Sequence, residues 1–476
     1  MNSIYRKINY KVLIIAVLGS GFIACRDYKS LAKVPDQNLK GIVRDAAVNE
    51  TDTASLSNVP WKEYFPDAKL QSLIEEGLRN NYDMKLAMSR INQADIALTM
   101  TKGAMLPTLS AGLNVDHTRF SHGARGEDVL GYYSNVISLG FAATWEADLW
   151  GKLSSQTKAK YAAYLQTQQY RYLVQTTMVS TLAQSYYSLL ALDEQLRVTK
   201  ETIVLLQKST ETMQALKDAG QQTQAAVEQS NALLYNTQLS VYDLQNKISQ
   251  QENAIAILVG RNPGPIDRGS INDLQVPGSM NDEIPLKALA RRPDVKQAEL
   301  SLQSAYALTD AAKAAFYPTL SIGSSSGPVT LGVGAGTFSD LFKPQSIAAE
   351  IVAGLAQPIF YKKQLKGNLK LMQAQQADAL LSFSHTLSLA GQEVSNIMYT
   401  YKMSVNKNDW RDKQVKSLTN AVDYTQELLK AGEASYTEVL SAQKDLLSAQ
   451  LGKVNDKLEQ LIQSVNLYKA LGGGIK

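Results

Sequence analysis

The chain has 476 residues, of which 45% are hydrophobic and 19% charged, as is typical of folded proteins. Its formal net charge is +4, and apart from three basic residues in the first eleven positions, 45 basic residues face 44 acidic ones, so no basic surface for nucleic acid is predicted. With one cysteine and three scattered histidines (His117, His122 and His385), we expect no disulfide within the chain, no metal site and no cofactor.

Residues 1–24 have the pattern of a secretory leader: a basic start, a short apolar run and then small residues. Cys25, the only cysteine, follows directly, and this arrangement resembles the bacterial lipoprotein signal, in which the cysteine is lipidated and becomes the mature N-terminus. Phe22 replaces the usual leucine, and Arg26 stands where many inner-membrane lipoproteins have a retaining aspartate. Residues 25–66 are expected to form a lipid-tethered, extended N-terminal segment.

The hydrophobic period changes within a first repeat at residues 67–266. Helical sequence runs to about residue 105, and an alternation typical of strands begins near Thr108. Lys152–Ala219 then contains neither glycine nor proline over 68 residues, which predicts a helix of roughly 100 Å, far longer than a compact core needs. The elements expected in this repeat are strands at about 107–120 and 134–148 and helices at about 152–219 and 222–259.

The same pattern begins again after a linker at residues 267–285. A shift of 211 residues lays Asp83–Ser110 over Asp294–Ser321 without a gap, with ten identities in 28 positions. Internal duplication therefore organises the chain, and each half is expected to contain a helix, two strands, a long helix, a turn and a return helix. The elements expected in the second repeat, residues 286–476, are strands at about 318–331 and 346–358 and helices at about 361–431 and 435–471.

The return helix of the second repeat has the most regular apolar seam in the chain, with residues at alternating three- and four-residue steps. Lys444 interrupts the seam. A charged group there either extends its side chain to water, which the periodicity alone favours, or lines an aqueous passage. The seam residues are Leu440, Leu447, Leu451, Val454, Leu458, Leu461, Val465 and Tyr468.

Four strands per chain are too few to close a barrel, since small barrels need about eight. Four strands would also leave two open edges, which neither lipid nor water tolerates well. Association of chains solves both problems, because two copies would supply eight strands and three copies twelve. The lipid tether, the strands and the long helical hairpins together indicate a shared barrel continued by a shared helical tube.

Several short motifs occur in order along residues 60–474. They are Trp61 with Phe65, Leu73 and Ile74, Trp145–Lys152 (WEADLWGK), Leu258–Gly264 (LVGRNPG), Arg291–Val295 (RRPDV), Ala315–Leu320 (AFYPTL), Ala431–Gly432, Val439–Gln443 (VLSAQ) and Val465–Gly474 (VNLYKALGGG). With these motifs the chain resembles the TolC-like outer-membrane efflux proteins, in the lipoprotein branch that works with RND-type pumps.

That resemblance implies a mainly helical fold with a β-barrel part, in which a homotrimer forms a 12-stranded barrel in the outer membrane of a Gram-negative bacterium and a 12-helix periplasmic tunnel. It implies a periplasmic adaptor and an inner-membrane RND-type pump as partners, besides outer-membrane lipid. The adaptor would dock at the two helix turns, and the last helix would begin at the closed aperture. The residues implied are Ala219, Gly220, Thr223, Ala431, Gly432 and Ser435 at the turns, and Glu438, Ser441 and Lys444 at the aperture.

Two of the aperture residues depart from or vary the family pattern. Glu438 matches the first of two acidic residues that the family commonly carries one turn apart, but Ser441 stands where the second is expected. Lys444 matches a basic residue found in some lipoprotein members. We therefore expect Glu438 and Lys444 to influence closure and ion selectivity.

The expected function is a passive outer-membrane exit duct for drugs or other small molecules. Two alternatives stay open: an outer-membrane channel for type I protein secretion, and a structural periplasmic coiled-coil lipoprotein, which would need no strands. An enzyme is not expected, because the sequence has no GxSxG motif, no Walker loop and no histidine–carboxylate cluster.

Overall fold

The structure is a computed structural model of the chain. The residues that it describes are 27–35, 41–44, 47–49, 59–119, 133–275, 283–323, 329–335, 338–339, 343–350, 352–357, 359 and 361–473. The predicted leader at residues 1–24 and the predicted lipidation site Cys25 lie outside them.

Two compact units divide the chain, and neither coincides with one of the two sequence repeats. One unit consists of Met1–Asp36, Arg90–Gln168 and Gln297–Phe383, and the other of Gln37–Ser89, Gln169–Lys296 and Ser384–Lys476. Each unit therefore takes residues from both repeats. The repeats describe how the sequence is duplicated, whereas the units describe how it packs.

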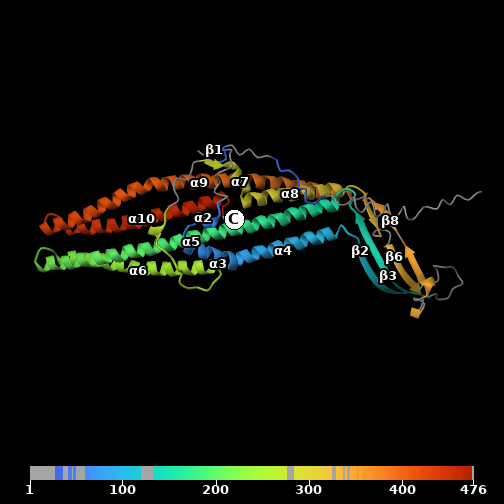
Figure 1. The fold of residues 1–476 in the computed structure, drawn as a ribbon, viewed down its shortest axis with the longest axis horizontal. Coiled ribbons are helices and arrows are strands. Elements are labelled where there is room, and N and C mark those ends of the chain that lie inside the picture. The colour runs from blue at the N-terminus through green and yellow to red at the C-terminus, as the bar shows by residue number, and fades with distance from the viewer. Residues whose placement is uncertain are drawn as a thin grey trace, which may run out of the picture. The chain divides into compact units, whose positions relative to one another are not determined.

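The first unit contains the main sheet (Figure 1). Its long hairpin consists of β2 and β3, which lie where the sequence predicts the first two strands. On its other side, β3 pairs with β6 and then, further along, with β5. β7 pairs with β6, and β8 pairs with β5. The strands are β2 (Thr108–Arg119), β3 (Tyr133–Ala147), β5 (Thr319–Ile322), β6 (Val329–Ala335), β7 (Ile347–Glu350) and β8 (Ala353–Ala356).

The two strands of the second repeat are each divided in two, where the sequence predicts single strands over 318–331 and 346–358. After β5, Gly323 has a φ of +80°, a left-handed conformation that interrupts a strand and that glycine adopts readily. Its N–H group donates to the carbonyl oxygen of Val352, between β7 and β8, at 2.8 Å. The break after β5 and the break between β7 and β8 therefore lie next to each other in the sheet.

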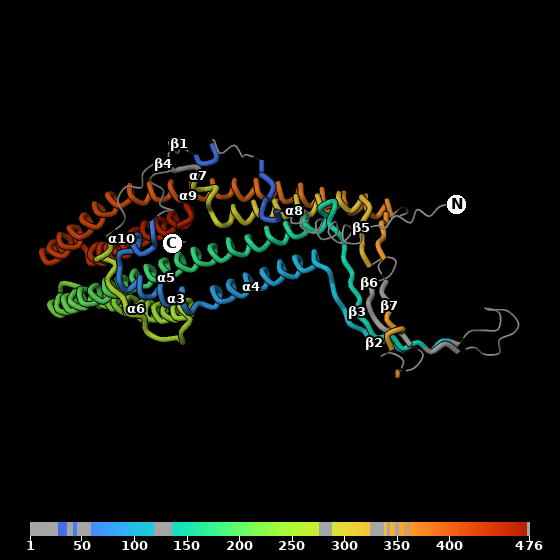
Figure 2. The backbone as a smooth tube through the Cα atoms, turned by 45° about the vertical axis from the view of Figure 1, so that its right-hand side comes forward, coloured from blue at the N-terminus to red at the C-terminus, as the bar shows by residue number. Residues whose placement is uncertain are grey.

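Two antiparallel helical hairpins, one formed by α5 and α6 and the other by α9 and α10, make up most of the second unit (Figures 1 and 2). The first residues of α5, up to 168, and of α9, up to 383, belong to the first unit. Each of these helices begins and ends within two residues of its predicted bounds. They are α5 (Lys152–Asp218), α6 (Gln224–Leu258), α9 (Lys362–Ala431) and α10 (Tyr436–Ala470), and α5 and α9 have 67 and 70 residues.

Shorter helices accompany the long ones in both units. Within the described residues, no helix has a stretch that is both long enough and apolar enough to cross a membrane. The shorter elements are α2 (Trp61–Tyr64), α3 (Ala68–Asn80), α4 (Tyr82–Gly103), α7 (Leu286–Arg291), α8 (Pro293–Ala314) and the 3-10 turns Ile271–Asp273 and Pro344–Ser346.

The core of the second unit forms where α2 and α3 cover α5, α6 and α10. Phe65 and Tyr186 are among its fully buried side chains. Tyr64 stacks on Tyr468 with 4.2 Å between ring centroids, and its hydroxyl donates to the carbonyl oxygen of Ser464 at 2.7 Å. The Tyr468 hydroxyl donates in turn to the carbonyl oxygen of Val59 at 2.8 Å. These tyrosines thus keep their polar ends paired while their rings pack in or against the core.

Part of the N-terminal segment predicted to be extended is fixed to the second unit. β1 (Ala47–Asn49) pairs in parallel with β4 (Glu283–Pro285), a short sheet that the sequence did not predict. Just before it, the carbonyl group of Ile42 lies so close to Gly391 of α9 that any Cβ there would collide with it. The Arg44 N–H group donates to Ser395 Oγ at 3.0 Å. Residues 42–44 of this segment are therefore packed against α9.

Candidate functional site

The two helix turns predicted to dock an adaptor are built alike. Gly220 and Gly432 have φ values of +75° and +77°, the left-handed conformation that ends a helix. The N–H group of the next residue donates to a carbonyl oxygen in the last helical turn, at 2.8 Å after Gly220 and at 2.9 Å after Gly432. The duplication seen in the sequence thus extends to the hydrogen bonds of the turns.

The helices that leave the turns begin differently. Thr223 caps α6, because its hydroxyl oxygen accepts from the N–H group of Ala226 at 3.3 Å. Ser435 makes no such capping bond to α10, and its hydroxyl lies 2.8 Å from that of Thr437 instead. The predicted turn residues are all exposed: Ala219, Gly220, Thr223, Ala431, Gly432 and Ser435.

A small apolar cluster brings the two turns together. Met213 and Val227 come from the α5–α6 hairpin, and Leu429 and Val439 from the α9–α10 hairpin, and all four are buried. Leu216 is partly buried and packs against this cluster. The two turns therefore lie next to each other at the hairpin tip, where the six predicted residues are exposed.

The predicted aperture residues Glu438, Ser441 and Lys444 are all exposed. Their spacing of three residues places them along one side of α10. Val439 and Gln443, which alternate with them, are buried on the other side. Lys444 lies outside the packed seam of α10. In a single chain this position is compatible both with a side chain that simply extends into water and with one that lines an aqueous passage.

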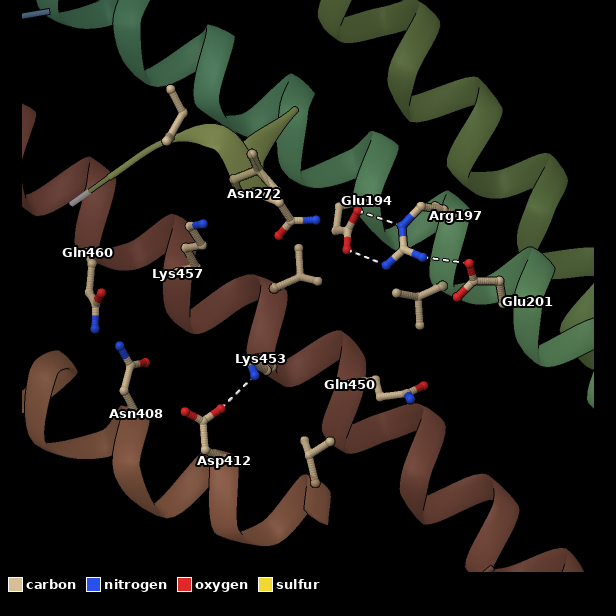
Figure 3. A pocket seen from close by; sticks show the side chains of 15 residues that line it. Glu194, Arg197, Glu201, Asn272, Asn408, Asp412, Gln450, Lys453, Lys457 and Gln460 are labelled. Carbon is tan, nitrogen blue, oxygen red and sulfur yellow. Dashed lines mark hydrogen bonds and ion pairs between the residues drawn. The ribbon is translucent and has the colours of Figure 1, made fainter. Parts of the chain in front are cut away.

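A cavity of about 610 Å³ lies among α5, α9, α10 and the linker after α6 (Figure 3). Arg197 pairs with Glu194 and with Glu201, each at 2.6 Å, and Lys453 pairs with Asp412 at 2.6 Å. The lining residues labelled in the figure are Glu194, Arg197, Glu201, Asn272, Asn408, Asp412, Gln450, Lys453, Lys457 and Gln460.

Lys457 differs from the other cations of this cavity, since no carboxylate in the described part of the chain lies within ion-pair distance of it. Burial lowers the pKa of its ammonium group, and the nearby carboxylates of Glu194 and Asp273 oppose that effect. The sequence did not predict this cavity, because its lining comes from four separated segments. Only the four-residue spacing of Lys453 and Lys457 indicates a polar face of α10.

A buried carboxylate joins α9 to α10 next to this cavity. Asp456 is 2% exposed and pairs with Lys407 and with Arg411, each at 2.6 Å. Gly452 leaves room for the guanidinium group, since a Cβ there would lie 2.9 Å from Arg411 Cζ. Burial alone would raise the pKa of Asp456, but the hydrogen bonds from Arg411 and Lys407 outweigh burial and hold that pKa below its usual range.

The described residues contain no group of three or more His, Cys, Asp or Glu side chains that could hold a metal ion. The features that stand out are instead a paired helical tip, an exposed row of residues next to it and ion pairs between helices.

Comparison with protein families relates this architecture to known proteins. The family model described as outer membrane efflux protein matches residues 73–261 and 284–473. The pyoverdine export outer membrane protein OpmQ of Pseudomonas putida is 28% identical over 426 residues, which cover 88% of this chain and 89% of that protein. The cation efflux system protein CusC of Escherichia coli K12 is 24% identical over 465 residues, which cover 97% and 98%.

Solved structures show the same fold. The outer-membrane channel OprN superposes with a TM-score of 0.85 at 22% identity, over 93% of this chain and 99% of that one. The open state of the Neisseria gonorrhoeae MtrE outer membrane channel superposes with a TM-score of 0.82 at 22% identity, over 94% and 98%.

The buried carboxylate yields a stability prediction. Asp456→Asn should lower the free energy of unfolding by about 1.5–3 kcal/mol, because it removes charged hydrogen bonds. Asp412→Asn, which breaks the exposed pair with Lys453, should cost no more than about 1 kcal/mol and serves as the control. Thermal unfolding followed by circular dichroism in detergent would compare the variants.

The pH dependence follows from the lowered pKa of Asp456. The stabilisation is fully present above the unfolded-state pKa of about 3.9 and is lost as the pH falls through the lower folded-state value. The difference between wild type and Asp456→Asn should therefore stay constant from neutral pH to about pH 5 and shrink below about pH 4. A difference that grows on acidification would contradict this assignment.

Proposed function

Because the chain belongs to the outer membrane efflux protein family, we propose that it is the outer-membrane exit duct of a tripartite efflux pump. The duct would passively conduct small molecules from a periplasmic adaptor and an inner-membrane RND-type pump to the cell exterior. The observation that carries the proposal is the combination, in one chain, of an amphipathic sheet and two long helical hairpins that the family model spans in both repeats.

The hairpin of β2 and β3 supports a membrane position for the sheet. Leu109, Leu113 and Val115 alternate along β2 and are 73%, 57% and 72% exposed. The register places Leu139 opposite Leu113, and directly opposed residues share a face. The other face of β2 carries polar residues such as Asn114. One apolar and one polar face is the pattern of strands that separate lipid from a water-filled interior.

The edges of the sheet support a trimer. Among the described strands, β2 pairs only with β3 at one edge, and β7 and β8 have no further partner at the other. If β5 with β6 and β7 with β8 each count as one broken strand, a chain contributes four strands and three copies contribute twelve. Closure between copies would satisfy the edge groups that lipid cannot.

The exposed row on α10 suits an aperture. Three copies would bring three Glu438 carboxylates near the axis, where they would repel one another and attract cations. Lys444 would partly offset that field. With Ser441 in place of a second acid, the negative field would come from one ring of carboxylates rather than two.

The tip of the two hairpins is the proposed docking surface for the adaptor, and it includes Gly220 and Gly432 with their neighbouring turn residues. Both turns are exposed and are held together by the buried cluster around Met213. An adaptor could therefore contact both hairpins of one chain at once. OpmQ is named for pyoverdine export and CusC for cation efflux, so relatives of this duct are named for chemically different cargoes.

The membrane position of the sheet can be tested with two neighbouring substitutions. Leu113→Arg should destabilise the membrane-inserted protein by about 2–4 kcal/mol, because it places a charge on the lipid-facing side. Asn114→Arg, one residue further and on the opposite face, should be tolerated. Heat resistance of the folded species in outer-membrane extracts would report the difference. Equal effects of both substitutions would argue against the assigned faces.

The proposed lipid anchor at Cys25 predicts a lipidated mature N-terminus. Metabolic labelling with palmitate should mark the wild-type protein, and Cys25→Ser should abolish the label because no other cysteine is present. The mass of the mature N-terminal peptide provides an independent check. A label that persists in Cys25→Ser would rule out this site.

The aperture can be tested by ion selectivity in planar bilayers. Glu438→Gln should lower the preference for cations several-fold, and Ser441→Glu should raise it by adding a second ring of acids. Lys444→Ala should also raise it. Glu427→Gln serves as the control, because it makes the same change of charge at an exposed position of α9, and it should leave selectivity unaltered. Identical selectivity in all four variants and the wild type would refute the proposed aperture.

A further inference from the structure

A second, smaller cavity of about 200 Å³ lies between α5, α9 and α10, nearer the hairpin tip than the cavity of Figure 3. Most of its wall area is apolar, and Leu206, Val422 and Leu447 contribute to this apolar area. The remaining lining residues are Thr202, Leu205, Thr419, Asp423, Gln426, Gln443, Leu446 and Gln450.

Gln443 presents an unpaired amide to this cavity. Its side chain is 6% exposed, and neither its Nε2 nor its Oε1 has a hydrogen-bond partner among the described residues. Leaving a buried amide unpaired carries a cost equivalent to roughly five- to 150-fold in an equilibrium constant. A native protein rarely bears such a cost without a ligand or water to satisfy the group.

The neighbouring polar groups of the lining form no hydrogen bond with the side chain of Gln443. The hydroxyl of Thr202 donates to the carbonyl oxygen of Val198 at 2.9 Å, and that of Thr419 donates to Val415 at 2.9 Å. Both hydroxyl protons are therefore used within their own helices. What remains in the lining is amide groups and one charged group, the carboxylate of Asp423, which lies exposed at the rim.

Size and charge together define a ligand class. An apolar cavity of about 150 Å³ can hold a benzene ring, so this cavity has room for a ring with one small polar substituent. A substituent with N–H donors would satisfy Gln443 Oε1. A positive charge on it would complement Asp423, since the lining contains no lysine, arginine or histidine.

We propose that the cavity between α5, α9 and α10 is a binding site for small aromatic cations, held by the amide of Gln443 and the carboxylate of Asp423. The cavity faces the side of α10 opposite to Glu438, Ser441 and Lys444. Its occupation does not require those three residues to line a channel, and a binding experiment therefore tests the site separately from the proposed function.

The test uses three fluorinated probes of nearly equal shape and different charge with the full-length protein in detergent. 4-Fluorobenzamidine is cationic, 4-fluorobenzamide is neutral and 4-fluorobenzoate is anionic, and ¹⁹F NMR line widths would give each dissociation constant. We expect the cation to bind most tightly, the neutral amide several-fold more weakly and the anion not at all. Equal binding of all three, or binding of none, would overturn the proposal.

Variants locate the binding. Gln443→Leu should weaken 4-fluorobenzamidine about tenfold, and Asp423→Asn should weaken it about threefold. Asp445→Asn, an exposed acid on α10 outside the lining, should leave its affinity unchanged. Weakening by Asp445→Asn to the same extent as by Asp423→Asn would indicate general attraction to acidic residues and would contradict the site.

A second measurement guards against a folding effect of Gln443→Leu. Because the amide is unpaired, its replacement by an apolar side chain of similar size should leave thermal stability unchanged or raise it. A variant that is clearly less stable than wild type would show that Gln443 has a partner in the protein, which would remove the basis of the proposal.

Discussion

The constraint on which the structure depends is the backbone of a sheet with two open edges. Hydrogen-bonding groups at a strand edge can be satisfied by water or by another strand, but lipid offers neither. In this chain β2 ends the sheet on one side and β7 and β8 end it on the other, within the part that the structure describes. The apolar face around Leu113 suits lipid, so the edges would need partners in a membrane, and the proposed association of copies would supply them.

The helices pose the same problem in another form. α5 and α9 are 67 and 70 residues long, and one chain leaves large apolar side chains on them uncovered, including Tyr399 and Trp410 at 66% and 72% exposure. Within a chain, specific polar contacts join the hairpins in addition to the core that α5, α6 and α10 share. Gln184 donates to Asn466 at 2.7 Å and Gln195 to Asn455 at 2.8 Å, and both pairs bridge α5 and α10. Such contacts fix the register of long helices that apolar packing alone would let slide.

Much of the fold was predictable from the sequence, for identifiable reasons. The long helices could be bounded within two residues because their interiors mostly lack breakers and their turns carry Gly220 and Gly432. The β2–β3 hairpin was predictable because apolar and polar residues alternate along it. The breaks in the second pair of strands were not, because the left-handed conformation of Gly323 and its bond to Val352 depend on the neighbouring strand.

The candidate site divides in the same way. The turn residues and Glu438 could be placed from the resemblance and lie exposed where one hairpin meets the other. The cavities could not, because each gathers side chains from three or four separated segments. The unpaired amide of Gln443 is likewise invisible in the sequence, where this residue is one polar position in an otherwise regular helix.

The central claim is that copies of this chain close a conducting duct. The most direct measurement is planar-bilayer conductance of the detergent-extracted protein, with its oligomeric mass determined on the same preparation. Trimeric particles that give small, cation-preferring currents are the predicted result. A monomer that never conducts would contradict the claim and would return the chain to the class of structural periplasmic lipoproteins.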